Sequence, residues 1–175
     1  GTVNVWDGTY YGGIMIQKPL MVQSQNGAAA TVIHGGLTTP AIYVVSVRAN
    51  DVTLDGFTVT NPLYSLHNAD VTGIMVGYYG DNNLSNIAVV NNIVTEIGSP
   101  ERALDTTADY PSIGIVVNGV IDGLEIANNT IHNIHQTVND PAVTWGPSAI
   151  GIYGFDTTPL STNLSVHDNE IYNIS

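Results

Sequence analysis

The basic residue Arg102 lies in a long acidic loop whose side chains are of the right kinds to do chemistry. Glu101, Asp105 and Asp109 surround it. Carboxylates of this sort bind calcium or position a substrate, and calcium beside a basic residue supports proton transfer. A solvated loop in which Arg102 pairs with a neighbour explains the same pattern, and we favour it because charged side chains usually stay in water. The three acids are thus candidate calcium ligands, and Arg102 with Asp105 and Asp109 forms the candidate catalytic group.

Other polar residues have weaker patterns. His132 and His135 are three residues apart, but a zinc site needs a third ligand, for which only Asp140 is near, so we interpret the pair as polar surface. Arg48 stands beside Asn50-Asp51, which indicates a structural ion pair. The aspartates near predicted strands lie in separate turns and cannot form the carboxylate pair that glycoside cleavage requires: Asp55, Asp122 and Asp168.

Aromatic residues gather on or beside the loops that flank one predicted column of strands. Aromatic rings beside amides and carboxylates are typical of sugar-binding grooves, through stacking and hydrogen bonds. The same residue types are typical of packed protein interfaces, and both interpretations stay open. The candidate carbohydrate-binding residues are Tyr78, Tyr79, Tyr110, Trp145 and Tyr153.

A two-residue turn signal recurs between short apolar runs along the chain. The apolar pair before it begins at positions 52, 87, 124 and 164, so the period grows from 35 (52 to 87) to 37 and then 40 residues (124 to 164). A period in this range, with alternating apolar residues inside each run, predicts a solenoid of β-strands. Glycine, asparagine and aspartate tolerate the left-handed backbone of a tight bend. The turns are Asp55-Gly56, Asn91-Asn92, Asn128-Asn129 and Asp168-Asn169.

We expect this corner to be structural. Stacked coils place equivalent corner residues above one another, so Asn92 and Asn129 are predicted to have positive φ and to stack. A second apolar column is predicted to stack inward, consisting of Ile42, Ile74, Ile115 and Ile152. The predicted ladder residues are Gly56, Asn92, Asn129 and Asn169.

Each coil is predicted to hold three short strands that run parallel to their equivalents in the next coil. Long loops should follow the third strand, at Asn61–Thr72, Glu96–Ser112 and Asn133–Ala149. Long loops on a rigid scaffold are where function usually lies. The predicted strands are Ile14–Ile16, Leu20–Val22 and Thr31–Ile33; Ile42–Val47, Val52–Leu54 and Thr58–Thr60; Ile74–Val76, Ile87–Val89 and Ile93–Thr95; Ile115–Val117, Leu124–Ile126 and Thr130–His132; and Ile150–Tyr153, Leu164–Val166 and Glu170–Tyr172.

Composition narrows the classes of partner. The chain has 175 residues and a formal net charge of −12, with 3 Lys+Arg against 15 Asp+Glu. This balance excludes nucleic acid, because phosphate binding needs clustered basic residues. It also argues against anionic membranes, and no 18-residue apolar stretch predicts a membrane span. The length suits a single domain over residues 1–175, with a core large enough to do without cysteine.

The opening segment VNVWDGTYYGGIMIQKPLMVQS, followed by TVIHGG, resembles the first coil of pectin-lyase-like right-handed parallel β-helix proteins. In that family a first strand, a G-T-Y turn, an I-x-I-x-K-P-L run and a T-V-I-x-G strand succeed one another. The later segments NLSNIAVVNNIVTEI and GLEIANNTIHNI resemble the family's generic repeat. The resemblance covers nearly the whole chain and implies an all-β fold, a right-handed parallel β-helix of about five coils. It implies no single activity, because these coils serve lyases, hydrolases, epimerases and surface proteins.

Both ends of the chain are predicted to be strands, Val3–Val5 and Ile171–Ser175, without a capping helix. Either the chain is a fragment whose caps were removed, or it is an uncapped subunit whose strand edges pair with another molecule. We therefore expect an extracellular or cell-surface structural protein, a filament, sheath or surface-layer subunit that stacks on itself through its ends. The alternative is a carbohydrate-active β-helix, a polysaccharide lyase or glycan-binding module that uses the long-loop face. The scarcity of basic residues weighs against the enzyme.

Overall fold

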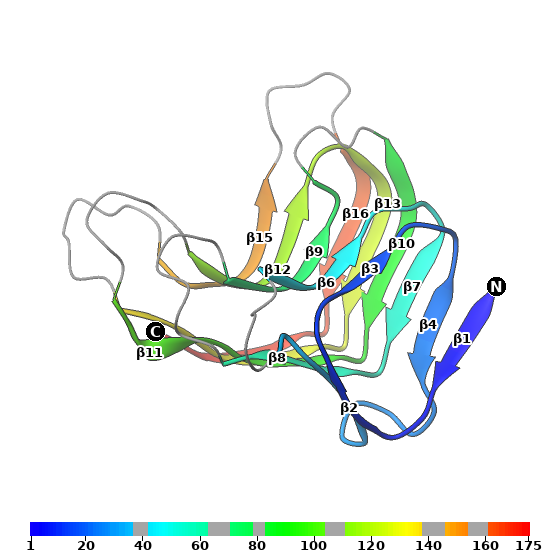
Figure 1. The fold of residues 1–175 in the computed structure, drawn as a ribbon. Coiled ribbons are helices and arrows are strands. Elements are labelled where there is room, and N and C mark those ends of the chain that lie inside the picture. Colours follow the sequence, from blue (N-terminus) through cyan, green and yellow to red (C-terminus); the bar gives the residue numbers. More distant parts are fainter. Residues whose placement is uncertain (37–41, 63–70, 79–82, 104–110, 138–145, 154–160) are drawn as a thin grey trace.

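The computed structural model describes residues 1–36, 42–62, 71–78, 83–103, 111–137, 146–153 and 161–175, and of residues 99–103 and 137 it describes the backbone only. These residues form three parallel sheets and no helix (Figure 1). None of them therefore belongs to an apolar helix that could cross a membrane. The chain winds from sheet A to sheet B to sheet C and back, as a right-handed parallel β-helix. Five coils hold three strands each, and a sixth has two described strands, β16 and β17.

Each sheet collects one strand from every coil, in sequence order. Sheet A consists of β1 (Thr2–Val5), β4 (Met21–Ser24), β7 (Val52–Asp55), β10 (Leu84–Val90), β13 (Ile121–Ala127) and β16 (Thr162–His167). Sheet B consists of β2 (Gly8–Tyr11), β5 (Thr31–His34), β8 (Thr58–Asn61), β11 (Ile93–Ala103), β14 (Thr130–Thr137) and β17 (Glu170–Ile174). Sheet C consists of β3 (Ile14–Ile16), β6 (Tyr43–Val47), β9 (Val71–Val76), β12 (Ser112–Asn118) and β15 (Ser148–Tyr153).

The coils lengthen along the chain while their strands stay in register. Val3, Val22, Leu54, Val89, Ile126 and Val166 are equivalent positions in sheet A. The separation between neighbouring equivalents grows from 19 residues (3 to 22) to 40 residues (126 to 166). Strand pairing therefore tolerates different connection lengths, because backbone hydrogen bonds and side-chain stacking act only between equivalent positions.

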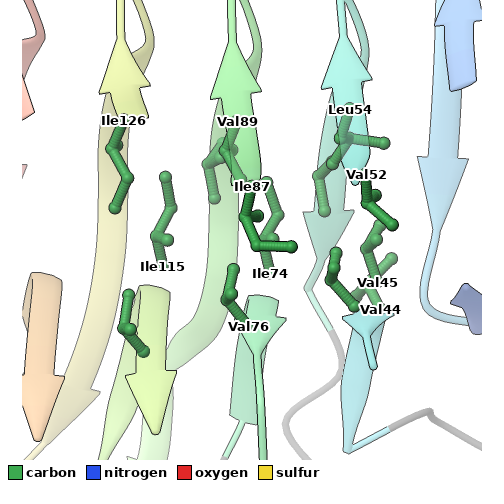
Figure 2. Packing of buried hydrophobic residues seen from close by; sticks show 14 of the residues in the cluster. Val44, Val45, Val52, Leu54, Ile74, Val76, Ile87, Val89, Ile115 and Ile126 are labelled. Carbon is green, nitrogen blue, oxygen red and sulfur yellow. The ribbon is translucent and has the colours of Figure 1, made fainter. Parts of the chain in front are cut away.

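The core lies between the three sheets and consists of aliphatic side chains stacked coil on coil. Leu54 in sheet A and Val45 and Ile74 in sheet C are completely buried, and Figure 2 shows them among their stacked neighbours. Full burial of such a side chain stabilises the fold by about 1.5–3 kcal/mol. Because each buried residue contacts its equivalents in adjacent coils, a shift of one residue in register would turn a whole row of apolar side chains outward.

One predicted column is wrong in two of its members. Val45 pairs with Ile74 and therefore occupies the place predicted for Ile42. Ile150 pairs with Ile115 and occupies the place predicted for Ile152. Ile42 precedes β6 and is exposed, whereas Ile152 lies in the next inward row and is exposed because β15 is the edge of sheet C. Consecutive apolar residues allow several registers, and the pattern alone did not select the right one.

The structure also moves several predicted boundaries. The G-T-Y segment expected as a turn is strand β2. The loops expected from Glu96 and from Asn133 begin later, because β11 continues to Ala103 and β14 to Thr137. Both strands contain a left-handed residue, Glu96 (φ 52°) or Asn133 (φ 55°), which made the sequence resemble the start of a loop. Such a residue bends a strand without ending its pairing.

The corner between sheets A and B has its left-handed residue one position earlier than predicted. Asn91 (φ 56°), Asn128 (φ 55°) and Asp168 (φ 52°) adopt this conformation, while Asn92 and Asn129 do not. The pairing of Asp55 with Val90 places Gly56 (φ 78°) in the same left-handed column. Gly56 is therefore not a member of the asparagine ladder, and Phe57 occupies the ladder position in that coil.

The ladder itself consists of three asparagine side chains that link four coils. Asn169 Oδ1 accepts hydrogen bonds from Asn129 N and Nδ2, both at 3.0 Å, and Asn129 Oδ1 accepts from Asn92 N (2.9 Å) and Nδ2 (3.1 Å). Asn92 Oδ1 accepts from Phe57 N at 2.9 Å. The amide nitrogens also donate to strand carbonyls, such as Val89 O from Asn129. Asn92 and Asn129 are buried, so the ladder satisfies backbone groups that water cannot reach.

Two further columns of left-handed residues lie on the outer surface. In sheet A the column is Asp51, Asn86, Gly123 and Asn163, and in sheet B it is Glu96, Asn133 and Asn173. Asn86 Nδ2 donates to Asp51 Oδ1 at 2.9 Å, and at the corner Asn91 Nδ2 donates to Asp55 Oδ1 at 2.8 Å. Asn133 likewise donates to Glu96. An acid in one coil thus accepts a hydrogen bond from an asparagine in the next.

The ladder predicts a contrast between adjacent asparagines. Replacing Asn129 with valine leaves buried groups, Asn92 N and Val89 O, without this partner, and we expect a loss of roughly 1–3 kcal/mol in the free energy of unfolding. Replacing exposed Asn128 with glycine, which adopts positive φ freely, should change it by less than about 0.5 kcal/mol. Urea denaturation followed by circular dichroism measures both. Equal midpoints for wild type and Asn129→Val would contradict a stabilising ladder.

Candidate functional site

The candidate catalytic loop is only partly described. The backbone of Glu101 and Arg102 belongs to the end of β11, and their side chains lie outside the described part. Asp105 and Asp109 are outside the described residues as well, as are Tyr79, Tyr110 and Trp145. Among the side chains that the structure does describe, no group of three histidines or acids is placed to hold a metal ion.

Tyr78 and Tyr153, the two described members of the aromatic set, lie near the outer face of sheet C. This face has a small apolar cluster of Met75, Ile113 and Val116, all buried, and Tyr43 and Tyr153 pack against it. Tyr78 follows β9, and its ring meets that of Tyr43 edge to face, with centroids 6.5 Å apart. The residues predicted from sequence are thus brought to one face, together with a tyrosine that the sequence analysis did not select.

Arg48 completes this cluster, which we call the sheet C cluster: Tyr43, Arg48, Tyr78 and Tyr153 around Met75, Ile113 and Val116. The Arg48 guanidinium carbon lies 4.3 Å from the centroid of the Tyr78 ring, and Arg48 Nε donates to Ser46 Oγ at 3.1 Å. Within the described residues Arg48 forms no ion pair, and the neighbouring Asp51 instead accepts a hydrogen bond from Asn86. A guanidinium over an aromatic face contributes about 0.5–2 kcal/mol and holds both side chains in place.

The outer face of sheet B has a polar and aromatic row that crosses all six strands. Equivalent positions in this row, which we call the sheet B row, are Tyr11, His34, Thr60, Thr95, His132 and Tyr172. The rings of His132 and Tyr172 are stacked, with centroids 4.7 Å apart and planes 7° apart. His132 also contacts Thr95 Oγ1 at 3.2 Å through Nδ1. His132 therefore belongs to a surface row, as the sequence predicted.

His135 lies beyond this row and makes a different contact. Its Nδ1 is 2.9 Å from Ser175 Oγ. Asp140, the third ligand considered for zinc, is outside the described residues. The two histidines thus have separate partners: His132 contacts residues of β11 and β17, and His135 contacts the residue that follows β17.

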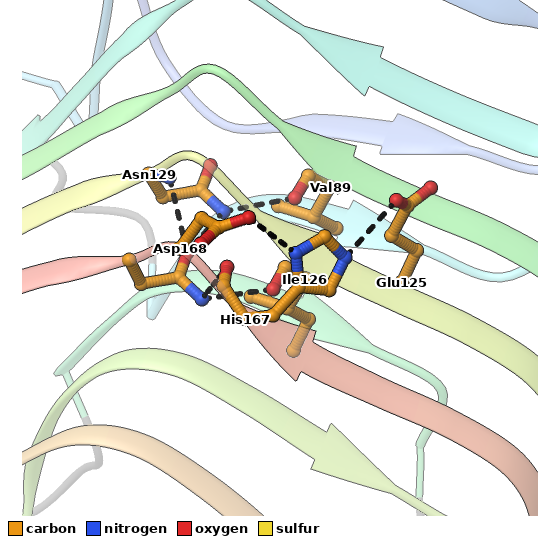
Figure 3. A network of polar contacts seen from close by, with 7 residues as sticks. Val89, Glu125, Ile126, Asn129, His167 and Asp168 are labelled. Atoms are coloured by element: carbon orange, nitrogen blue, oxygen red, sulfur yellow. Dashed lines mark hydrogen bonds and ion pairs between the residues drawn. The ribbon is translucent and has the colours of Figure 1, made fainter.

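At the edge of sheet A, the imidazole of His167 lies beside two carboxylates, those of Glu125 and Asp168. Its Nε2 lies 3.4 Å from Glu125 Oε1 and its Nδ1 lies 2.9 Å from Asp168 Oδ2, beside the asparagine ladder (Figure 3). The hydrogen bond to Asp168 is the main cause that raises the pKa of His167 above its ordinary 6.5. Desolvation opposes this rise, and the hydrogen bond to Glu125 and the charges of both acids add to it. The His167 side chain is exposed, so the rise in its pKa comes from these two neighbouring carboxylates.

Among the described residues, the strands at the two edges of each sheet expose side chains that face the interior. The edge strands are β1, β2 and β3 at one end and β15, β16 and β17 at the other. Figure 1 shows β1 and β16 at opposite edges of sheet A. Inward-facing residues of these edge strands are exposed, namely Ile152, Leu164, Val166 and Ile171 at one end and Val3 and Tyr10 at the other. These end faces were expected from sequence, and their apolar rows continue those of the core.

Comparisons with protein-family models, with curated protein sequences and with solved structures found no match to this chain. The fold places the chain in the class of parallel β-helix proteins. The pectin-lyase-like resemblance of the opening segment agrees with this fold.

The contacts of His167 predict its response to pH. Because its pKa is raised on folding, the stability it contributes is present below pH 6.5 and is lost as the pH rises through the raised value. We expect NMR titration of the imidazole to report a lower pKa in Asp168→Asn and a smaller decrease in Glu125→Gln. The loss of urea resistance between pH 6 and pH 8 should be smaller in His167→Gln than in wild type. An unchanged titration in both acid variants would contradict the network.

The chemistry on the described faces also leads to a prediction about catalysis. With three basic residues in the chain and no paired carboxylates predicted, we expect no release of unsaturated products from uronic-acid polymers. Absorbance of the unsaturated product, with and without added calcium, measures this. Robust release that disappears in Arg102→Ala would place an active site in the loop around Arg102.

Proposed function

We propose that this chain is an extracellular structural β-solenoid that assembles end to end with copies of itself. The observation that carries the proposal is the exposure of apolar side chains in the last coil at positions that are buried one coil earlier. Val166 is 46% exposed, whereas its equivalent Ile126 is 0% exposed. Ile171 is 48% exposed, and its equivalent Ile131 is 0% exposed.

The backbone supports the same proposal. β15, β16 and β17 each have one edge without a partner strand among the described residues, and so do β1, β2 and β3 at the other end. Such edges are templates for pairing with another strand. A second copy supplies the next strands of sheets A and B, so that β16 meets β1 and β17 meets β2. Sheet C has five strands where the other two sheets have six, so β15 and β3 do not meet directly across such a joint. Each contact removes apolar area from water and satisfies backbone groups together.

The distribution of charge favours contact through the ends over contact through the sides. Residues 1–24 contain one acidic side chain, Asp7, and one basic side chain, Lys18, whose charges cancel, whereas the whole chain has a net charge of −12. The first coil can therefore approach the acidic last coil with little repulsion. Lateral contact would bring acidic faces together, which is unfavourable at low salt and becomes tolerable once salt or divalent cations screen the charge. Because the two ends differ, the contact is heterologous and builds an open filament.

A second candidate function is carbohydrate binding, the alternative suggested by the pectin-lyase-like resemblance. The sheet C cluster favours it. Arg48 offers a guanidinium for the carboxylate of an acidic sugar, and Tyr78 beside it is 37% exposed and offers an aromatic surface. Arg48→Gln and Tyr78→Ala should both weaken retention on an immobilised uronic-acid polymer. Unchanged retention would leave the cluster with a packing role only.

The end-to-end proposal predicts different effects for neighbouring residues of β16. Val166 faces inward and Ser165 faces outward on the same exposed strand. Val166→Lys should raise the concentration at which assembly begins by about 10- to 100-fold, because about 1.5–3 kcal/mol of burial is lost at each joint. Ser165→Lys should have a much smaller effect. Sedimentation velocity over a concentration series, with electron microscopy of the same samples, measures both.

Circular dichroism of both lysine variants provides the control for folding. Because the two positions are exposed in the single chain, both variants should keep the β-sheet spectrum of the wild type. A wild-type chain that remains monomeric at high concentration, with its β-structure intact, would overturn the proposal.

A further inference from the structure

The sheet B row ends in a tyrosine at both ends of the solenoid. Tyr172 lies on β17 and Tyr11 on β2, and these are the edge strands of sheet B. Both tyrosines are exposed, and each is next to a histidine of the adjacent coil. The interior of the row, by contrast, has the two threonines Thr60 and Thr95. Aromatic residues thus occupy the places where the next copy would meet this row.

The geometry of Tyr172 leaves one ring face available. His132 lies parallel to Tyr172 at a centroid distance of 4.7 Å and covers the face toward β14. The opposite face is directed beyond the edge of the sheet, because no described strand follows β17. At the other end Tyr11 lies 5.2 Å from His34, with planes tilted by 50°. Its ring likewise borders the edge where a preceding coil would lie.

We propose that the joint between copies is fixed in register by Tyr172 of one copy, which stacks on Tyr11 of the next. This inference rests on the end-to-end assembly proposed above and adds the residues that set the alignment. The partner surface is the first coil of a second copy of this chain. The sheet B row then continues through the joint, and aromatic stacking contributes beyond the area it buries.

The same register also aligns sheet A. If Tyr172 meets Tyr11, the row two residues earlier brings Glu170 beside Thr9, since both rows run through every strand of sheet B. In sheet A, Val166 then continues the inward row that begins at Val3. A slip of one residue would place inward side chains opposite outward ones and would lose the apolar contact. One aromatic pair on the surface therefore reports the alignment of sheets A and B at the joint.

The absence of cysteine in the chain allows a direct test by cross-linking. Paired parallel strands are about 4.8 Å apart, which lies within the range that a disulfide spans. A displacement of two residues along the strand increases the separation to about 8 Å, beyond that range. Cysteine pairs in matching rows should therefore form bonds between copies, and pairs in different rows should not.

The experiment compares four double variants under mild oxidation. The variants lie in sheet A, so that both tyrosines are kept. The matched pairs are Thr2→Cys with Ser165→Cys and Asn4→Cys with His167→Cys, and the mismatched pairs are Thr2→Cys with His167→Cys and Asn4→Cys with Ser165→Cys. We expect both matched variants to give a ladder of dimers, trimers and longer species on non-reducing gels, at least tenfold faster than the mismatched variants. All four positions are exposed, so folding should be unaffected, and circular dichroism checks this.

The outcomes separate this inference from the proposed function. If wild type assembles by sedimentation but mismatched pairs cross-link as fast as matched ones, or no pair cross-links, the register is overturned while end-to-end assembly stands. If wild type does not assemble at any concentration, both proposals fail. Faster cross-linking of the matched pairs alone, together with weaker assembly of Tyr172→Ala, supports the aromatic joint.

Discussion

The fold depends on keeping equivalent residues of successive coils in register while the chain turns sharply between sheets A and B. The turn leaves backbone groups that the strands cannot satisfy. The buried amides of Asn92 and Asn129 satisfy them and link each coil to the next. Because the same side chains contact both the turn and the neighbouring coil, they hold the alignment on which every apolar row of the core depends. Coils of very different length can then stack on one another.

The sequence predicted most of the fold because short alternating apolar runs recur at a regular spacing. Its errors have physical causes. Asn91-Asn92 contains two residues that tolerate positive φ, and only the hydrogen bonds of the folded chain decide that Asn91 adopts it. Asp55-Gly56 resembled the same dipeptide, but the residues equivalent to Asn91-Asn92 are Gly56 and Phe57. Glycine can adopt the left-handed conformation of Asn91, whereas Phe57 has no amide side chain and contributes only its backbone N to the ladder. Because Glu96 and Asn133 resemble loop residues, the sequence predicted that β11 and β14 would end before them.

The candidate surfaces were harder to predict. The sequence placed Tyr78 near the candidate face because it lies beside a predicted strand. Its contact with Arg48 could not be predicted, because the two residues follow neighbouring strands of sheet C that belong to different coils. The continuous row from Tyr11 to Tyr172 required the register of all six strands, and that register depends on the left-handed positions that the sequence left undecided. By contrast, strands β1 and β17 followed from the apolar patterns of the first and last residues of the sequence.

The register also determines how this acidic chain avoids straining its own sheets. Where side chains are described, Asp51, Asp55, Glu96, Asp122, Glu125, Asp168 and Glu170 each belong to a different row of sheets A and B or of the corner between them. No carboxylate in these rows therefore has another directly above or below it, where like charges across a strand pair would be destabilising. In some rows an asparagine of the next coil lies beside the acid and donates a hydrogen bond to it, as Asn86 does to Asp51. The solenoid can thus present a strongly negative exterior to other molecules without placing the described carboxylates of adjacent coils directly against one another.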